Sequence, residues 1–299
     1  MSLVTAILSY ATLWLVIITN TGSPTQTQIQ IDHLQGHTSY SFADQYDPTS
    51  KLEFPLTGWY LHSETTAPIT DDTTGKFGIS KNIQSNTGKS LDSDWNPKDF
   101  LSTFSESDTN TNALKIKASI EKTFIETSLF KSKIGLSYEY QQYLFILSNT
   151  HEIEYKQNGS QTEQTITGTN LNYDIHYYIP QIEFSFVPNI KETMIELTIG
   201  YSPYTTAQDH DNHLLLFKKL ESHTTGQSLS IEIKNTTPIN PTLKFIAEIQ
   251  YLNIATSGIQ THTQYESHTT PSGVIPVGII GTAPNKINSS QLTYSIGIN

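Results

Sequence analysis

The sequence predicts an all-β protein, folded as a ten-stranded antiparallel transmembrane β-barrel with long extracellular loops. From about Gln28 onwards, apolar and polar residues alternate with a period of two, which is the pattern of strands that have one apolar face. The connections alternate between short turns and long polar stretches. Short turns on one rim, long loops on the other and strands of about ten residues or more are typical of outer-membrane barrels.

Each expected strand is a run of alternating residues bounded by Gly, Asn, Thr, Ser or Pro. The alternation is clearest at Leu229, Ile231 and Ile233, with polar residues between them. The expected strands cover residues 28–40, 51–61, 76–83, 113–124, 133–147, 168–186, 193–205, 213–234, 242–254 and 287–298. Closing these ten strands into a barrel would remove the exposed edges of the sheet.

The expected connections support a barrel whose two rims differ. Short turns are predicted near 129–131, 191–192 and 236–238, and long polar loops at 42–50, 84–112, 148–167, 206–212 and 255–286. Eight tyrosines fall near strand ends, where an interfacial aromatic belt would lie. They are Tyr60, Tyr138, Tyr140, Tyr143, Tyr177, Tyr178, Tyr201 and Tyr204.

The chain begins with a long apolar run at residues 3–19, followed by a small polar stretch at 20–23. This pattern predicts a signal peptide at residues 1–22 and one barrel domain at 23–299. A single membrane anchor is the alternative, because no Lys or Arg precedes the apolar run. A soluble β-sandwich or jelly roll would also show alternating strands. The strand lengths and the signal-like start favour the barrel.

Composition excludes several classes of function. The chain has no Cys, which excludes disulfides, thiolate metal sites and cysteine nucleophiles. Its 17 basic residues are all Lys, and 28 acidic residues give a formal charge of -11. Nucleic acid is therefore not an expected partner, because phosphate binding needs a basic surface. A cationic substrate would suit this charge better.

The densest run of ionisable side chains is Asp-His-Asp-Asn-His at residues 209–213. In an extended backbone Asp209, Asp211 and His213 point the same way, so that Asp211 can orient His213. The alternatives are an ordinary polar loop tip or a divalent-metal site. A metal site made of these three residues and His210 would need His210 turned inward.

A second acidic cluster, Asp92 and Asp94 followed by Trp95, lies in the expected 84–112 loop. Two carboxylates at i and i+2 of an extended chain face one side and can share a proton, which raises one pKa. Calcium-binding loops and turns also contain Asp-x-Asp, so the pattern alone leaves those alternatives open.

Asp-x-Asp-Trp at 92–95, together with Asp-x-Asp-x-His at 209–213, resembles the omptin family of outer-membrane proteases. The resemblance extends over nearly all of the mature chain. It includes Gly36-His37-Thr38 and the segments 51–54, 105–109, 134–141 and 175–180.

The resemblance implies an endopeptidase in the outer membrane, with a groove at the extracellular rim. Asp211 and His213 would form a dyad on one wall, and Asp92 and Asp94 a couple on the other. The nucleophile would be water held between them, with no metal, cofactor or covalent intermediate. The expected partners are peptide or protein substrates and outer-membrane lipid such as lipopolysaccharide. The expected assembly is a monomer. The alternative is an inactive barrel that acts as an adhesin or structural protein.

The chemistry of these side chains supports hydrolysis independently of the resemblance. A neutral His with a pKa of about 6.5 can take a proton from water, provided that a carboxylate fixes its tautomer. A carboxyl pair that shares a proton can hold the water and donate a hydrogen bond to the developing oxyanion.

Two departures from the family pattern concern substrate and lipid binding. The acidic specificity pocket of the family is matched at Asp209, but its second acid is replaced by Tyr40. We therefore expect Asp209 and Tyr40 to bind substrate with a relaxed preference, so that Lys or Arg is accepted but not required, since a Tyr ring attracts cations only moderately. The absence of Arg excludes bidentate guanidinium clamps on lipid phosphates.

Overall fold

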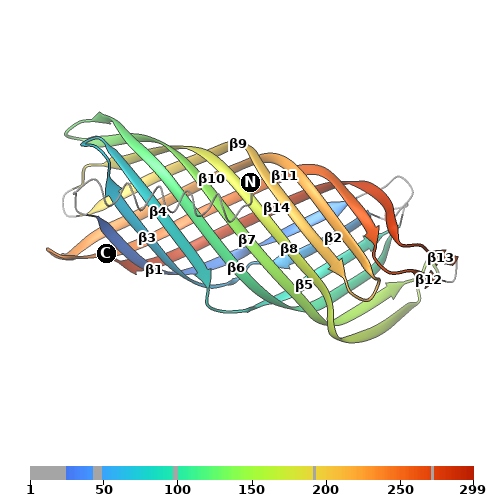
Figure 1. Cartoon of the computed structure of the whole chain (residues 1–299). Coiled ribbons are helices and arrows are strands. Elements are labelled where there is room, and N and C mark those ends of the chain that lie inside the picture. Colours follow the sequence, from blue (N-terminus) through green and yellow to red (C-terminus); the bar gives the residue numbers. More distant parts are fainter. Residues whose placement is uncertain (1–24, 43–48, 97–99, 191–192, 271–272) are drawn as a thin grey trace.

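The fold is a closed antiparallel barrel (Figure 1). The computed structural model describes residues 25–42, 49–96, 100–190, 193–270 and 273–299, so the expected signal peptide at 1–22 lies outside the described residues. Pairing between β1 (Gln26–Phe42) and β14 (Gly278–Ile298) joins the two ends of the main sheet. The predicted all-β antiparallel class is therefore confirmed. Within the described ranges, no helix is long and apolar enough to cross a membrane.

In the part of the chain that the structure describes, the main sheet contains twelve strands and a separate hairpin adds two short ones. Every pairing is antiparallel. Between β1 and β14, the main-sheet strands are β2 (Thr49–Pro55), β3 (Gly58–Pro68), β4 (Thr73–Asn82), β5 (Asn86–Trp95), β6 (Leu101–Glu126), β7 (Phe130–Tyr155), β8 (Gln161–Pro188), β9 (Met194–His213), β10 (Lys218–Asn240) and β11 (Leu243–Gln264). The hairpin is β12 (His268–Thr270) with β13 (Gly273–Ile275).

The number of strands differs from the predicted ten because two positions around the barrel are interrupted. β3 pairs with the first half of β1 and β2 with its second half, so the two lie end to end. β4 and β5 pair in the same way with the two halves of β6. Twelve strands thus occupy ten positions. One break follows Pro55, which has no backbone N–H to continue the ladder.

The predicted long loops are largely strands in the structure. Residues 84–112 contain β5 and the first part of β6, and 206–212 belong to β9. Turns of only five and four residues, 156–160 and 214–217, connect β7 to β8 and β9 to β10. The polar composition was misleading, because backbone pairing between neighbouring strands does not need apolar side chains when the outer face meets water.

Two of the three predicted short turns can be compared with the structure. The turn between β6 and β7 lies at 127–129, which overlaps the prediction. The turn between β10 and β11 lies at 241–242 instead of 236–238, because the β10 ladder continues to Asn240. The turn expected at 191–192 falls outside the described residues.

An outward-facing apolar band surrounds one part of the barrel. It contains exposed side chains from most of the main strands: Ile29, Ile31, Trp59, Leu61, Ile120, Ile134, Leu136, Ile182, Phe184, Ile199, Ile231, Ile233, Phe245, Ile249, Ile296 and Ile298. At roughly 3.4 Å per residue, the 26 residues of β7 are far longer than the roughly 25 Å of such a band. The strands therefore continue well beyond the membrane.

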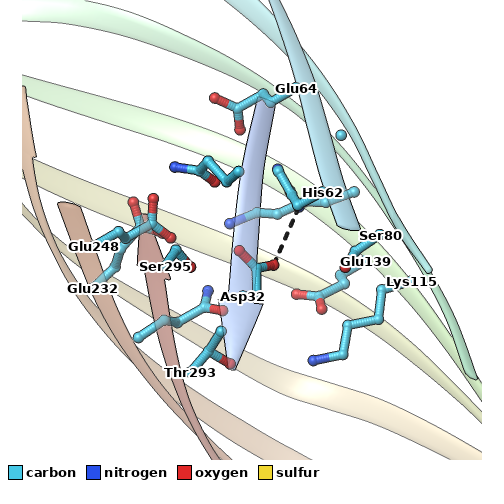
Figure 2. Close-up of a pocket in the computed structure, with 14 residues that line it drawn as sticks. Asp32, His62, Glu64, Ser80, Lys115, Glu139, Glu232, Glu248, Thr293 and Ser295 are labelled. Carbon is cyan, nitrogen blue, oxygen red and sulfur yellow. Dashed lines mark ion pairs between the residues drawn. The ribbon is translucent and has the colours of Figure 1, made fainter. Parts of the chain in front are cut away.

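The barrel interior at the level of this band is polar and ionic. Lys133 Nζ lies 2.6 Å from Glu196 Oε1 and 3.5 Å from Glu121 Oε2, and Lys117 Nζ lies 2.8 Å from Glu183 Oε1. Next to these pairs is a small cavity, shown in Figure 2, whose lining includes Asp32, His62, Glu64, Lys115, Glu139, Glu232 and Glu248. A polar interior inside an apolar outer wall is what a membrane barrel requires.

An aromatic layer fills the interior beyond the ionic region. The rings of Phe54 and Tyr173 stack with centroids 4.3 Å apart, and Phe54 and Phe145 lie 4.9 Å apart. Tyr40 packs beside them, 5.2 Å from the ring of Tyr173. All four side chains are completely buried. This layer provides a floor for the part of the barrel that extends beyond the membrane.

Closure of the barrel predicts a strict requirement for glycine at position 36. Gly36 has a φ of +151°, and a Cβ placed there would lie 2.0 Å from the backbone oxygen of Ser290. We expect Gly36→Ala to disrupt the β1–β14 seam and abolish heat-modifiable migration, the gel signature of an intact barrel. Gly281→Ala in β14 is the matched control, because a Cβ there meets open space. Normal folding of Gly36→Ala would mean that the seam tolerates a side chain at position 36.

Candidate active site

The two acidic clusters lie around one cleft beyond the aromatic layer. Asp92 and Asp94 come from β5 and His213 from the end of β9, and all three side chains line the cleft. The cleft has a volume of about 470 Å³, which falls within the usual range for ligand sites, roughly 300–1,000 Å³. It can therefore hold several residues of a peptide.

Strand geometry explains the position of the carboxyl couple. Asp92 and Asp94 lie two residues apart in β5, so both face the cleft. Asp94 is directly opposite Ser50 on β2 and accepts a hydrogen bond from its hydroxyl. The Oδ1 atom of Asp92 is buried and has no hydrogen-bond partner in the described part of the chain. An unpaired carboxyl oxygen of this kind is suited to a bound water or substrate group.

The environment of the couple favours one shared proton. Burial, followed by the negative charge of Asp94, raises the pKa of Asp92 to about 8. Burial also raises the pKa of Asp94, although the hydrogen bond from Ser50 opposes this change. Two close carboxyl groups removed from water cannot both ionise easily. Near neutral pH the pair therefore keeps a proton that it can donate in a hydrogen bond.

The dyad is built from consecutive inward positions of β9. His213 Nε2 lies 3.1 Å from Asp211 Oδ2, and the same Oδ2 accepts a hydrogen bond from the hydroxyl of Tyr40. Asp211 is completely buried, whereas 23% of the His213 side chain is exposed. Because Nε2 is held by Asp211, Nδ1 is the ring nitrogen left to take up a proton.

The charge balance around His213 favours its protonated form. Burial acts to lower the pKa of His213, but the charge and hydrogen bond of Asp211 outweigh burial, so the pKa is raised above its usual value of 6.5. The charge of Asp92 adds to this effect. The ring can therefore hold the proton that it removes from water.

Asp209 lies behind the cleft wall and does not line the cleft. It is 1% exposed. Its Oδ2 accepts a hydrogen bond from the Tyr173 hydroxyl at 2.9 Å, and its Oδ1 accepts from the Ser222 N–H at 2.9 Å and from the Ser222 hydroxyl. Burial raises the pKa of Asp209 to about 6, and the hydrogen bonds from Ser222 and Tyr173 limit the rise.

Tyr40 reaches the cleft, but its hydroxyl is already engaged. The residue lines the cleft and is completely buried, with the hydroxyl donated to Asp211. Burial, followed by the charge of Asp211, raises its pKa well above the usual value, so it remains a neutral donor. The structure thus brings Tyr40, Asp92, Asp94 and His213 to one cleft, with Asp211 directly behind His213.

The alternative of a metal site does not fit the structure. That site needed His210 turned inward, but His210 lies on the outer face of β9 and its Nδ1 is 2.9 Å from Glu221 Oε1 on β10. The alternation of β9 keeps His210 on the side opposite His213. Across the described ranges, no group of three or more His, Asp or Glu side chains is placed to hold a metal ion.

The cleft also contains Glu152 and Lys218, which the sequence did not single out. Glu152 lies in β7, in a stretch expected to be a loop. A register shift between Leu147 and Thr150 changes the alternation, and Asn149 within it has a φ of 52°. Counting by twos from Leu147 would therefore have placed Glu152 on the outer face. The only signal of this bulge in the sequence is the Asn itself, because Asn tolerates a positive φ better than most residues.

Two comparisons with known proteins, a family model and one solved structure, agree with this fold. The model of the Omptin family matches residues 43–297, which confirms the resemblance found in the sequence. The crystal structure of the outer membrane protease OmpT from Escherichia coli superposes with a TM-score of 0.72 at 14% identity, covering 92% of this chain and 97% of that one. The translocator domain of the autotransporter NalP from Neisseria meningitidis gives 0.34 at 9% identity, covering 99% and 96%. No curated protein matches the chain.

The dyad predicts a specific effect of Asp211 on His213. Because the charge and hydrogen bond of Asp211 are the largest influences that raise the pKa of His213, we expect Asp211→Asn to lower that pKa. Histidine NMR titration in detergent measures the change. Asp174→Asn is the control, since Asp174 faces outward beside His176, 3.2 Å from its Nε2, and should leave His213 unaffected. An unchanged pKa of His213 in Asp211→Asn would disprove the pairing.

Proposed function

Because this chain belongs to the omptin family, we propose that it is an outer-membrane endopeptidase that hydrolyses peptide bonds with an activated water molecule. The observation that carries the proposal is the cleft itself, which has the Asp92–Asp94 couple on β5 and the His213–Asp211 dyad on β9. A base and a carboxyl pair that keeps a proton are the two functions that such a hydrolysis needs.

His213 acts as the general base in this mechanism. Its Nδ1 takes a proton from water as the water attacks the peptide carbonyl carbon, while Nε2 remains held by Asp211. Asp211 stabilises the imidazolium formed in this step, and the Tyr40 hydroxyl keeps the buried carboxylate in position. The protonated ring then gives its proton to the leaving amine, which restores the neutral base.

The carboxyl couple acts from the opposite side of the attacked carbonyl. One oxygen of the pair holds the water, and the shared proton is donated in a hydrogen bond to the developing oxyanion. The raised pKa of Asp92 keeps this proton in place near neutrality. A pair with two full charges would instead repel the oxyanion.

Proposed orientation and partners follow from the position of the cleft. The dyad on β9 lies beyond the apolar band, which on that strand includes Ile199. In barrels of this type the longer end of the wall faces the exterior, so we place the active site on the extracellular side. The substrates are then peptides or proteins at the cell surface. Outer-membrane lipid, including lipopolysaccharide, contacts the apolar band of a monomeric barrel.

Loss of the proposed base should abolish most peptide hydrolysis. We expect His213→Ala and Asp211→Asn each to reduce kcat/KM by about two orders of magnitude or more, the usual contribution of a positioned general base. His210→Ala is the matched control, because its ring lies outside the barrel beside Glu221. Heat-modifiable migration verifies folding of each variant. Retained activity in folded His213→Ala would refute the assignment, and inactivity of the unaltered barrel would favour an adhesin or structural role.

The requirement for a neutral His213 and a protonated couple predicts a bell-shaped dependence of the rate on pH. His213 must be neutral to act as a base, so the rate should rise as the pH passes through its raised pKa, above 6.5. The couple must keep its proton, so the rate should fall as the pH passes through about 8, the pKa of Asp92. A pH profile of kcat/KM on a peptide without titrating groups measures both limbs. A rate that stays constant up to pH 10 would contradict the role of the couple.

A further inference from the structure

Apolar side chains stand directly beside the catalytic groups in the strand register. Leu52 on β2 is opposite Asp92, and Leu171 on β8 is opposite His213. Leu220 on β10 is opposite Asp211, and all three leucines line the cleft. Directly opposed residues in a sheet have Cβ atoms only about 5 Å apart. The three leucines are 3%, 5% and 1% exposed, respectively, so they are an apolar base of the cleft beside the reacting groups.

The apolar surface continues from this point to the mouth of the cleft. Leu147 on β7 is opposite Leu171 and extends the same wall. Leu215 and Leu216, in the turn between β9 and β10, are 51% and 49% exposed while they also line the cleft. Phe42 and Ile166 complete the apolar part of the lining. Water on such a surface is displaced favourably by an apolar ligand group.

Asp209 and Tyr40 were expected to hold a basic substrate side chain, but neither presents a free carboxylate oxygen to the cleft. Asp209 is sealed behind the wall, where both of its oxygens accept hydrogen bonds from Tyr173 and Ser222. The Tyr40 hydroxyl is donated to Asp211. A Lys or Arg side chain placed beside Leu171 and removed from water would find no free oxygen on Asp209, which is costly.

Besides the Asp92–Asp94 couple on β5, the charged side chains of the cleft include Lys218 and Glu152. Lys218 is directly opposite His213 and lines the cleft, so its positive charge opposes a cation at that wall. Glu152 is opposite Ser105 on β6, next to the strand that carries the couple, and its Oε1 accepts a hydrogen bond from Gln164 at 2.5 Å. One oxygen of its carboxylate is therefore engaged by Gln164.

We propose that this cleft selects peptides with an apolar side chain, of the size of leucine or phenylalanine, next to the scissile bond in preference to lysine or arginine. The inference rests on the proposed peptide hydrolysis and specifies its substrate class. Leu52, Leu171 and Leu220 form the pocket for that side chain, and Leu147 extends it.

The test compares otherwise identical peptides that carry Leu, Phe, Lys or Arg at the two positions flanking the cut. We expect kcat/KM for the Leu or Phe peptide to exceed that for the Lys or Arg peptide by at least about tenfold, the discrimination that a hydrophobic pocket supplies. Faster cleavage of the basic peptides, with the cut beside Lys or Arg, would overturn the inference and leave the proposed hydrolysis intact.

A paired substitution locates the pocket on the cleft wall. Leu147→Glu adds a carboxylate to the lining and should shift the ratio of Leu to Lys cleavage toward Lys by about tenfold or more. Ile146→Glu is the matched control, because the neighbouring side chain of β7 faces outward and is 39% exposed. Leu147→Ala serves if the charged variant does not fold, and it should reduce the preference for Leu. Equal effects at 146 and 147 would overturn the assignment.

Binding of uncleavable peptides separates the two proposals. Reduced-amide analogues of the Leu and Lys peptides cannot be hydrolysed, so fluorescence anisotropy with the unaltered barrel reports binding alone. We expect the Leu analogue to bind at least about tenfold more tightly. Tighter binding of the Leu analogue, together with no cleavage of the ordinary Leu peptide, would refute the hydrolysis and support the pocket. Equal or tighter binding of the Lys analogue would refute the pocket, whatever the catalytic result.

Discussion

This structure depends on the continuous ladder of backbone hydrogen bonds around the barrel. Each main strand is paired on both sides, and the β1–β14 pairing closes the ring. Backbone hydrogen bonds do not depend on side-chain polarity. The ladder therefore extends beyond the apolar band into segments whose polar sequence predicts loops. β5 is held in this way between β2 and β6. The ladder thus fixes two acidic clusters, more than a hundred residues apart in sequence, on facing walls.

The aromatic layer separates two electrostatic environments inside one barrel. On the membrane side, lysines such as Lys133 pair with Glu121 and Glu196. On the other side, burial is the largest influence on Asp92 and Asp94, and the pKa values of both rise. A low dielectric above a closed floor therefore favours the protonated form of these two carboxyl groups.

The sequence predicted the barrel class and the residues of the cleft better than it predicted their local setting. Period-two alternation was sufficient to place Asp211 and His213 on one inward face, because β9 is regular there. It did not reveal that β5 is a strand, since its pairing partners are distant in the chain and its own residues are polar. It also could not place Glu152, because a bulge at Asn149 reverses the alternation.

The replacement at position 40 and the burial of Asp209 are linked by charge. A carboxylate at position 40 would face Asp211 in a layer that already contains Asp209, and three buried acids would repel one another strongly. Tyr40 instead supplies a donor, so Asp211 gains a hydrogen bond beside His213. Tyr173 does the same for Asp209. Position 40 therefore donates a hydrogen bond to the Asp211 carboxylate and adds no negative charge to this layer.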